Sequence, residues 1–382
     1  MSTATKSYVI ANATTTDAVK VEQNYNDILT FLNGSVVHRD GSKSFTGNID
    51  GVTPVNSTHL ANKGYVDGLV SGAGAQRRNT ITNGNFDVWQ RGVGPFTATG
   101  FTADMWKLFN GAGSTNSVSR SGPSVGGPGN PQVYSLAWNR TVAGSGNSSI
   151  YTNIETVQNF SGRTVTVSFY AQANTAMALS VYLSQFFGTG GAPSTSVAST
   201  AASLNITTTA TLFTATFTLP SVAGKTLGTT GDSLIAFFER AIAQPNGIVN
   251  IWNVQLEDGS VATPFEYEPP STTLARCQRY FVRFAGAGSI GTGYGNSATI
   301  VARCIVVLPQ TMRATPTVTL VGAVGLFDGT NPNTTVTSFT SVIYHQNILN
   351  VDANTAGGIT QYRPFGLYVG GGGSVDVSAE LP

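Results

Sequence analysis

The sequence predicts a mainly β protein: short N-terminal helices followed by two antiparallel β-sandwich domains of the jelly-roll type. Apolar and polar side chains alternate with a period of two through most of the chain beyond residue 80, which is typical of half-buried strands. Turn-forming stretches such as "GGPGNP" and "GTGGAP" separate these runs. Only 10% of residues are charged, against roughly 25% in average globular proteins, so few helix-favouring surface residues are present.

Residues 1–76 differ from the rest and are expected to form an attachment and oligomerisation region. Thr14 and Asp17 form a capping-box pattern at the start of a helix, and Gly34 is placed to end it. The apolar residues of this helix follow the spacing of a coiled-coil seam over two heptads: Ala18, Val21, Tyr25, Ile28 and Leu32. A second short helix is expected at "STHLANKGYVDGLV". Two narrow apolar stripes cannot build a core alone, so these helices need partner copies or a larger assembly.

The remaining chain divides into residues 77–270 and residues 271–382. In "RTVTVSFYAQA", Val165, Val167, Phe169 and Ala171 fall on one face of a strand. The first stretch has the size of a jelly-roll domain. Tandem prolines in "YEPPSTT" interrupt the strand pattern, and a second sandwich is expected after them.

Composition excludes several classes of protein. The net charge of +1 provides no basic patch for nucleic acid. No apolar run reaches the length of a membrane span, and the N-terminus lacks the apolar core of a secretory signal. The two cysteines, Cys277 and Cys304, are too few for a disulfide framework and are expected to be buried thiols. A protein made in a cytosol but built like an exterior protein indicates a virion component.

Several stretches, taken in order, resemble bacteriophage tail fibre or receptor-binding proteins. The N-terminal "VVHRDGSKSFTG" resembles their virion-proximal region. "NGNFDVWQRG" at 83–92 and "WNVQLEDGSVATPFEYEPP" at 252–270 resemble the opening and closing of a jelly-roll domain found in them. "CQRYFVRF" at 277–284 and "MRATPTVTL" at 312–320 resemble the domain that often follows. The resemblance implies a homotrimer in the phage tail that contacts other virion proteins through its N-terminal region. It also implies adhesion to a host cell-surface glycan by a carbohydrate-binding-module-like domain.

Nothing in the sequence forms a recognisable catalytic arrangement, so the chain is not expected to be an enzyme. The three histidines lie far apart, and no metal-spaced cluster or phosphate-binding loop appears. A glycan-degrading spike is the less favoured alternative, and it would need two carboxylates across a cleft. Glu266 and Glu268, two residues apart in an extended segment, are the nearest approach to such a pair. A collar, head or baseplate fibre without a primary receptor role is a further alternative.

Glycan binding needs aromatic rings for the C–H faces of sugars and polar side chains for their hydroxyls. Three groups of residues meet this need: a platform in "VYSLAWNR", a pair before a glycine loop, and loops at the C-terminal tip. The candidates in order are Tyr134, Trp138, Asn139, Arg140, Phe186, Phe187, Tyr294, Tyr362 and Phe365. The Tyr134 and Trp138 face could instead be the core face of its strand. No cofactor is expected, although a structural calcium ion could be held with the help of Asp104 or Asp258.

Overall fold

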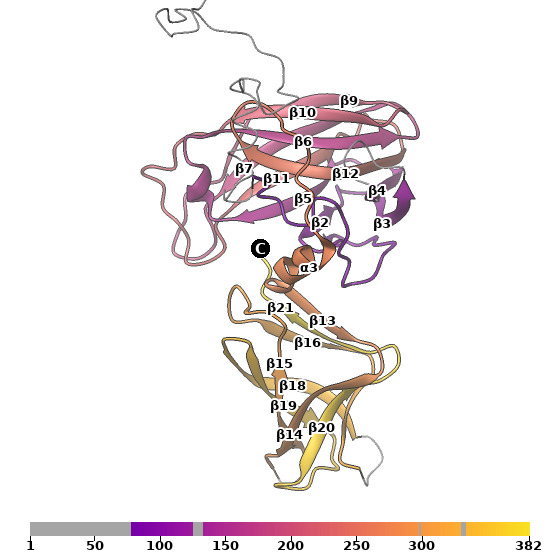
Figure 1. Cartoon of the computed structure of the whole chain (residues 1–382), viewed down its shortest axis with the longest axis vertical. Helices are drawn as coiled ribbons and strands as arrows, with labels where there is room; N and C mark the ends of the chain where they lie inside the picture. Colours follow the sequence, from indigo (N-terminus) through magenta and orange to yellow (C-terminus); the bar gives the residue numbers. More distant parts are fainter. Residues whose placement is uncertain (1–77, 125–132, 298, 330–333) are drawn as a thin grey trace, which may run out of the picture. The chain divides into compact units, whose positions relative to one another are not determined.

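The computed structural model describes residues 78–382, apart from 125–132, 298 and 330–333. The described residues belong to one compact unit (Figure 1). The expected N-terminal helices, with the seam of Ala18, Val21, Tyr25, Ile28 and Leu32, lie outside the described residues. Two hydrophobic cores divide the described chain into a first domain up to about residue 280 and a second domain after it.

The first domain is a sandwich of two antiparallel sheets. The larger sheet has the order β1 (Gly100–Phe101), β2 (Trp106–Phe109), β5 (Ser148–Glu155), β11 (Ser233–Arg240), β7 (Met177–Phe186) and β8 (Val197–Ala198), with β9 (Ala202–Ile206) also paired to β7. The smaller sheet has the order β10 (Thr211–Thr218), β6 (Thr164–Ala173), β12 (Gly247–Asp258), β4 (Val133–Val142) and β3 (Thr115–Ser124). A short 3-10 turn, η1 (Val157–Phe160), joins β5 to β6.

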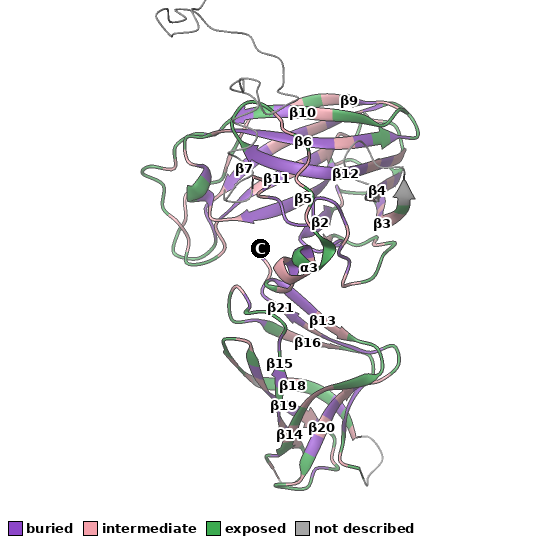
Figure 2. Ribbon diagram, viewed as in Figure 1, coloured by how far each residue is buried: buried purple, intermediate pink, exposed green. Residues whose placement is uncertain are grey.

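The core of the sandwich follows the alternation seen in the sequence. Val165, Val167, Phe169 and Ala171 of β6 are all buried, as the pattern predicted. Their counterparts on the larger sheet include Phe238 of β11, whose ring meets that of Phe169 edge-on at 5.0 Å. Figure 2 shows this buried layer between the two sheets.

The second domain departs from the expected sandwich. Six of its strands close into a barrel in the order β14 (Gly288–Gly295), β15 (Val301–Val307), β19 (Ile348–Thr355), β18 (Thr334–His345), β17 (Val324–Phe327) and β20 (Pro364–Val369). The other three form a small sheet in the order β13 (Phe281–Ala285), β21 (Ser374–Ser378) and β16 (Thr317–Val321). Register shifts in β14 and β18 bend the strands, and bends of this kind favour closure.

A helix occupies the place where the sequence indicated only a break. α3 (Pro270–Gln278) begins directly after Pro269, so Pro270 fills the first helical position. Proline is favoured there because its missing N–H would have no partner in the first turn. Cys277 and Tyr280 pack from this segment into the first core, so the helix belongs to the first domain. None of the described helices is long and apolar enough to cross a membrane.

Candidate functional site

A row of stacked aromatic rings crosses the outer face of the larger sheet. Phe237 of β11 pairs in register with Tyr151 of β5 on one side and Tyr182 of β7 on the other. Their neighbours Ile150, Val181 and Phe238 point into the core, so these three rings point outward. Ring centroids lie 5.1 Å apart for Tyr151 and Phe237 and 4.8 Å apart for Tyr182 and Phe237. We call Tyr151, Phe237 and Tyr182 the aromatic row.

A cation stands at one end of the aromatic row. Lys107 of β2 pairs in register with Tyr151, so its side chain lies on the same outer face. Its Nζ lies 5.6 Å from the ring centroid of Tyr151 and 4.5 Å from that of Phe101. Ammonium groups at such distances are attracted to aromatic faces. Burial lowers the pKa of Lys107 from its ordinary value, with Glu380 opposing this effect.

A hydrogen-bonded carboxylate lies beside the other end of the row. Glu239 is two residues from Phe237 and therefore on the same face of β11. It accepts a hydrogen bond from the Tyr182 hydroxyl at 3.4 Å and another from Asn147 Nδ2 at 2.9 Å. Burial, together with the charge of Glu239, raises the pKa of Tyr182 to about 12. The phenol therefore stays protonated and can donate hydrogen bonds at neutral pH.

This arrangement provides the chemistry that a sugar needs. The partly exposed ring edges offer apolar surface to C–H groups, while phenol, carboxylate and amide groups can bond to hydroxyls. Except for Asn147, which directly precedes β5, these side chains come from paired strands, so most of the surface is formed in advance of binding. The sequence contained a signal for Tyr182, which occupies a polar-side position of the alternating run in β7, but not for Phe237, because β11 reads as a nearly continuous apolar run. It did not contain the register that brings three separate strands together.

The platform proposed in β4 is not exposed, which corrects the expectation for this strand. Trp138 is fully buried in the first core, and its Nε1 donates to Asn116 Oδ1 at 2.9 Å. Arg140 is also fully buried and donates to the main-chain oxygen of Ala241 at 2.9 Å. The Trp138 face is the core face of β4, since its register partners Val118 of β3 and Val249 of β12 are also fully buried in the first core.

The other two members of that platform, Tyr134 and Asn139, lie on opposite faces of β4. Tyr134 is partly exposed, with the guanidinium of Arg120 4.3 Å from its ring centroid. Asn139 is partly exposed and is adjacent in sequence to Trp138, so it faces the opposite side of the sheet.

The pair before the glycine loop is also divided. Phe187 is fully buried, which corrects its candidacy as an exposed ring. Phe186 is partly exposed and pairs in register with Ser233. It lies on the same face of β7 as Tyr182, four residues along the strand, and so faces the same side of the sheet as the aromatic row.

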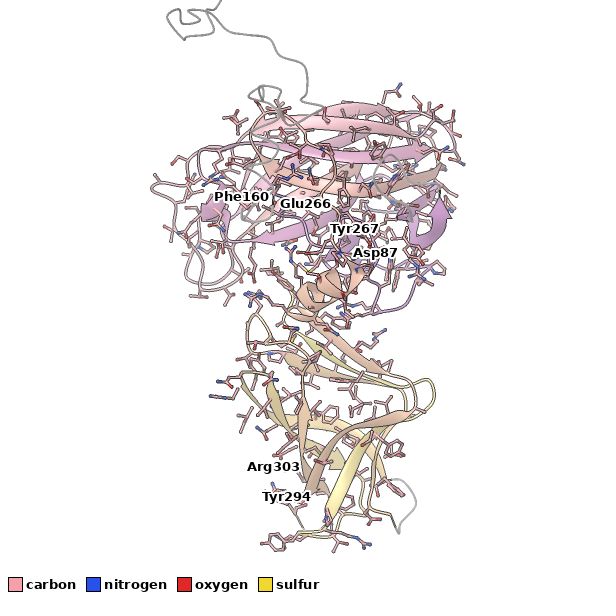
Figure 3. The ribbon with its side chains drawn as sticks, viewed as in Figure 1. Asp87, Phe160, Glu266, Tyr267, Tyr294 and Arg303 are labelled. Carbon is pink, nitrogen blue, oxygen red and sulfur yellow. The ribbon has the colours of Figure 1, made fainter. Side chains whose placement is uncertain are left out.

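The tip candidates lie on the barrel of the second domain. Tyr294 is 43% exposed and lies on strand β14, which corrects its expected place in a loop; it pairs in register with Arg303 of β15 (Figure 3). Tyr362 is 77% exposed in the turn before β20, and its N–H donates to the Gly295 oxygen at 2.9 Å. The structure therefore brings Tyr294 and Tyr362 to one end of the barrel. Phe365 is only 4% exposed and belongs to the second core, which corrects its assignment to a binding loop.

The calcium candidates have other partners. Asp104 is buried and accepts hydrogen bonds from the main-chain and side-chain nitrogens of Gln90. Asp258 is exposed and pairs with Arg163 at 2.8 Å. Among the described residues, no three His, Cys, Asp or Glu side chains gather as a metal site would require.

Glu266 and Glu268 line a small polar cavity together with Asn79, Asn83 and Asn85. Its volume is about 10 Å³, which is room for about one water molecule. Glu266 accepts a hydrogen bond from the main-chain N–H of Asn79, and Glu268 accepts one from the Thr273 hydroxyl. A sugar ring does not fit in a cavity of this size.

Comparisons with known proteins give similarity of structure only. No protein-family model matches the chain, and no curated protein matches it. A solved structure described as a family 4 carbohydrate-binding module is 18% identical over 47% of this chain and 99% of its own, with a TM-score of 0.31. The enzymatically active domain of bacteriophage CBA120 tailspike protein 4 is 17% identical over 47% of this chain, with a TM-score of 0.30, and the match spans 21% of that protein's chain. A family 11 carbohydrate-binding module from Clostridium thermocellum is 12% identical over 42% of this chain and 91% of its own, with a TM-score of 0.29. All three TM-scores lie below 0.5, so these neighbours carry no weight in assigning a function.

Proposed function

We propose that this chain is a phage tail fibre or short tail spike protein that attaches the virion to a host cell-surface glycan without cleaving it. The observation that carries the proposal is the aromatic row, flanked by Lys107 at one end and by Glu239 with Asn147 beside the other. Stacked rings and hydrogen-bonding groups on a rigid sheet are suited to binding a saccharide. The virion role is supported by the ordered sequence motifs that resemble tail fibre proteins.

In this proposal the chain acts as a homotrimer. Three linked copies turn later contacts into intramolecular ones, so avidity can exceed the affinity of one shallow site. The N-terminal region would join the copies and contact other virion proteins. Light scattering of the purified full chain tests this directly, since a monomeric mass would contradict the trimer.

The test of glycan binding compares two aromatic variants. Phe237→Ala removes the central ring of the aromatic row, whereas Tyr170→Ala removes a partly exposed ring on the outer face of the smaller sheet. Binding of each full-length variant to purified host envelope polysaccharide is measured by surface plasmon resonance. We expect Phe237→Ala to lose about tenfold or more in affinity, about 1.4 kcal/mol, while Tyr170→Ala stays near the original value. If both variants and the unmodified chain bind with equal affinity, the aromatic row is not the glycan-binding site.

The same polysaccharide distinguishes adhesion from degradation. A reducing-end assay on the incubated sample should show no new chain ends. New ends that disappear in Glu266→Gln or Glu268→Gln would favour a glycan-degrading spike. Immunolabelling of intact virions separates a tail location from a collar or head location.

A further inference from the structure

The last residues of the second domain are held against the first domain. Leu381 is buried in the first core, and its main-chain oxygen accepts a hydrogen bond from Lys107 Nζ at 2.9 Å. The main-chain oxygen of Pro382 accepts one from Asn153 Nδ2 at 3.0 Å. Asn153 lies two residues from Tyr151 on the outer face of β5. We call residues 379–382 the docking segment.

The docking segment carries a carboxylate into this contact. The Glu380 side chain is 6% exposed, and its Oε2 lies 2.5 Å from Arg91 Nη2. Oε1 of Glu380 is buried and meets no hydrogen-bond donor among the described residues. The Arg91 guanidinium lies 3.4 Å from the ring centroid of Phe281 and 4.8 Å from that of Phe101, so apolar rings from both domains restrict access of water.

Charged groups from both domains surround Glu380. Asp104, Lys107 and Arg91 approach from the first domain. From the second domain, the Ser378 hydroxyl donates to Glu380 Oε2 and the Arg313 guanidinium donates to the Glu380 main-chain oxygen. Arg283, which pairs with Asp376, acts on Asp104. Glu155 of the first domain pairs nearby with Arg279 and Arg313.

Burial dominates the balance of these effects on the Glu380 carboxyl. Burial raises its pKa from 4.5 to about 7; Arg91 and Lys107 oppose the increase, whereas the charge of Asp104 adds to it. A carboxylate in a poorly hydrated site with one oxygen lacking a donor favours its protonated form. Burial also raises the pKa of Asp104, so both buried acids of the contact take up protons more readily than free ones.

We propose that docking of the segment 379–382 on the first domain is coupled to proton uptake by Glu380, so that the contact tightens as the surroundings become mildly acidic. When the segment is released, the carboxyl regains water and holds its proton only below about pH 4.5. When the segment is docked, the proton is held up to about pH 7. Between these limits the docked state binds the proton and the released state does not, so docking gains stability as pH falls and loses it as pH rises through 7.

The coupling has a consequence for the aromatic row that rests on the proposed function. Lys107 contacts both the Tyr151 ring and the docking segment. Release of the segment would free Lys107 and uncover the Asn153 side of the row. The affinity of a ligand for the aromatic row would therefore differ between pH 8 and pH 5.5. The coupling between docking and proton uptake itself requires no ligand.

The test uses the full-length chain and the variants Glu380→Gln and Glu155→Gln. Glutamine keeps the shape of the protonated carboxyl and cannot ionise. Glu155→Gln removes ion pairs at the same contact but leaves Glu380 intact, which makes it the matched control. Urea unfolding is followed between pH 5.5 and 8.0 by tryptophan fluorescence and by energy transfer between dyes at Thr209→Cys and Thr360→Cys.

We expect the unfolding constant of the unmodified chain, divided by that of Glu380→Gln, to rise about 30-fold from pH 5.5 to pH 8.0. The Glu155→Gln variant should be less stable by a similar factor at every pH. A ratio for Glu380→Gln that stays constant within about twofold would overturn the proposal. If Glu380→Gln does not fold, the side-chain carboxyl carbons of the glutamate-labelled unmodified chain are titrated instead. One glutamate with a titration midpoint near pH 7 supports the proposal, and midpoints all below about pH 5.5 overturn it.

Discussion

Lys107 Nζ donates a 2.9 Å hydrogen bond to the main-chain oxygen of Leu381, which lies 274 residues further along the chain. The same ammonium group faces the rings of Phe101 and Tyr151. One side chain therefore connects the aromatic row of the first domain with the docking segment of the second. The stability of that connection can be measured by substitution.

Replacement of this lysine should weaken the contact between the domains. Lys107→Met keeps most of the apolar stem but removes the charged donor, which leaves the Leu381 oxygen without this partner. We expect the free energy of unfolding to fall by about 1–2 kcal/mol. Urea denaturation measures it. Lys225→Met is the control, since Lys225 is exposed and 5.8 Å from the Phe187 ring centroid, and it should change stability by less than about 0.5 kcal/mol. Equal losses in both variants would contradict a specific role for Lys107.

A fully buried arginine should differ sharply from an exposed one. Arg240 donates to the main-chain oxygens of Pro245 and Gly247 at 2.8 and 3.0 Å. Because the Arg240 side chain is fully buried, Arg240→Met removes both of these hydrogen bonds from the interior, and we expect a loss of about 2–4 kcal/mol in the free energy of unfolding. Arg163→Met removes only the exposed ion pair with Asp258 and should cost less than about 1 kcal/mol. Thermal unfolding of the two variants side by side checks the contrast; a smaller loss in Arg240→Met than in Arg163→Met would count against it.

Closure of the barrel depends on a glycine in β14. A Cβ added at Gly293 would lie 2.0 Å from the Arg303 main-chain oxygen and 2.7 Å from the Cys304 Cα. Gly293→Ala must therefore push β14 away from β15, at a cost of about 1–3 kcal/mol or more. At Gly288, the start of the same strand, an added Cβ would meet no atom within 4 Å, so Gly288→Ala is the control and should be tolerated. Circular dichroism melting curves would refute the idea if both alanine variants unfolded at the same temperature.

The second-domain thiol should resist modification until the chain unfolds. Burial, with the charge of Asp352, raises the pKa of Cys304 from 9.0 to about 12. The native thiol therefore stays protonated at pH 8.5, and only the thiolate reacts readily. Stability should fall as pH rises from 9 toward 12, because the unfolded chain loses this proton first. Alkylation with iodoacetamide, read by mass spectrometry before and after guanidinium treatment, tests this; labelling of Cys304 in the native chain would contradict it.

The sequence predicted the features that depend on local pattern. Val165, Val167, Phe169 and Ala171 share the buried face that their spacing indicated. α3 was missed because tandem prolines indicate a break, although proline also suits the first turn of a helix. Barrel closure was missed because it depends on bulges and on close approaches between strands.

The aromatic row shows the same limit in the candidate site. Tyr151, Tyr182 and Phe237 come from three strands, and only their register makes them neighbours. Trp138 was proposed as exposed because either face of an alternating strand can be the core face. The sequence pattern alone does not choose between the two faces, whereas packing of one face against the larger sheet does.

Burial of Leu381 in the first core also sets an order of events during synthesis. The strands of the first domain leave the ribosome well before residue 381 does, so they can pair early. Their hydrophobic core nevertheless stays incomplete until the whole second domain has been translated and has delivered its docking segment. The first domain should therefore acquire its final protection against proteolysis only when translation reaches the docking segment, which makes its maturation a late step rather than an early one.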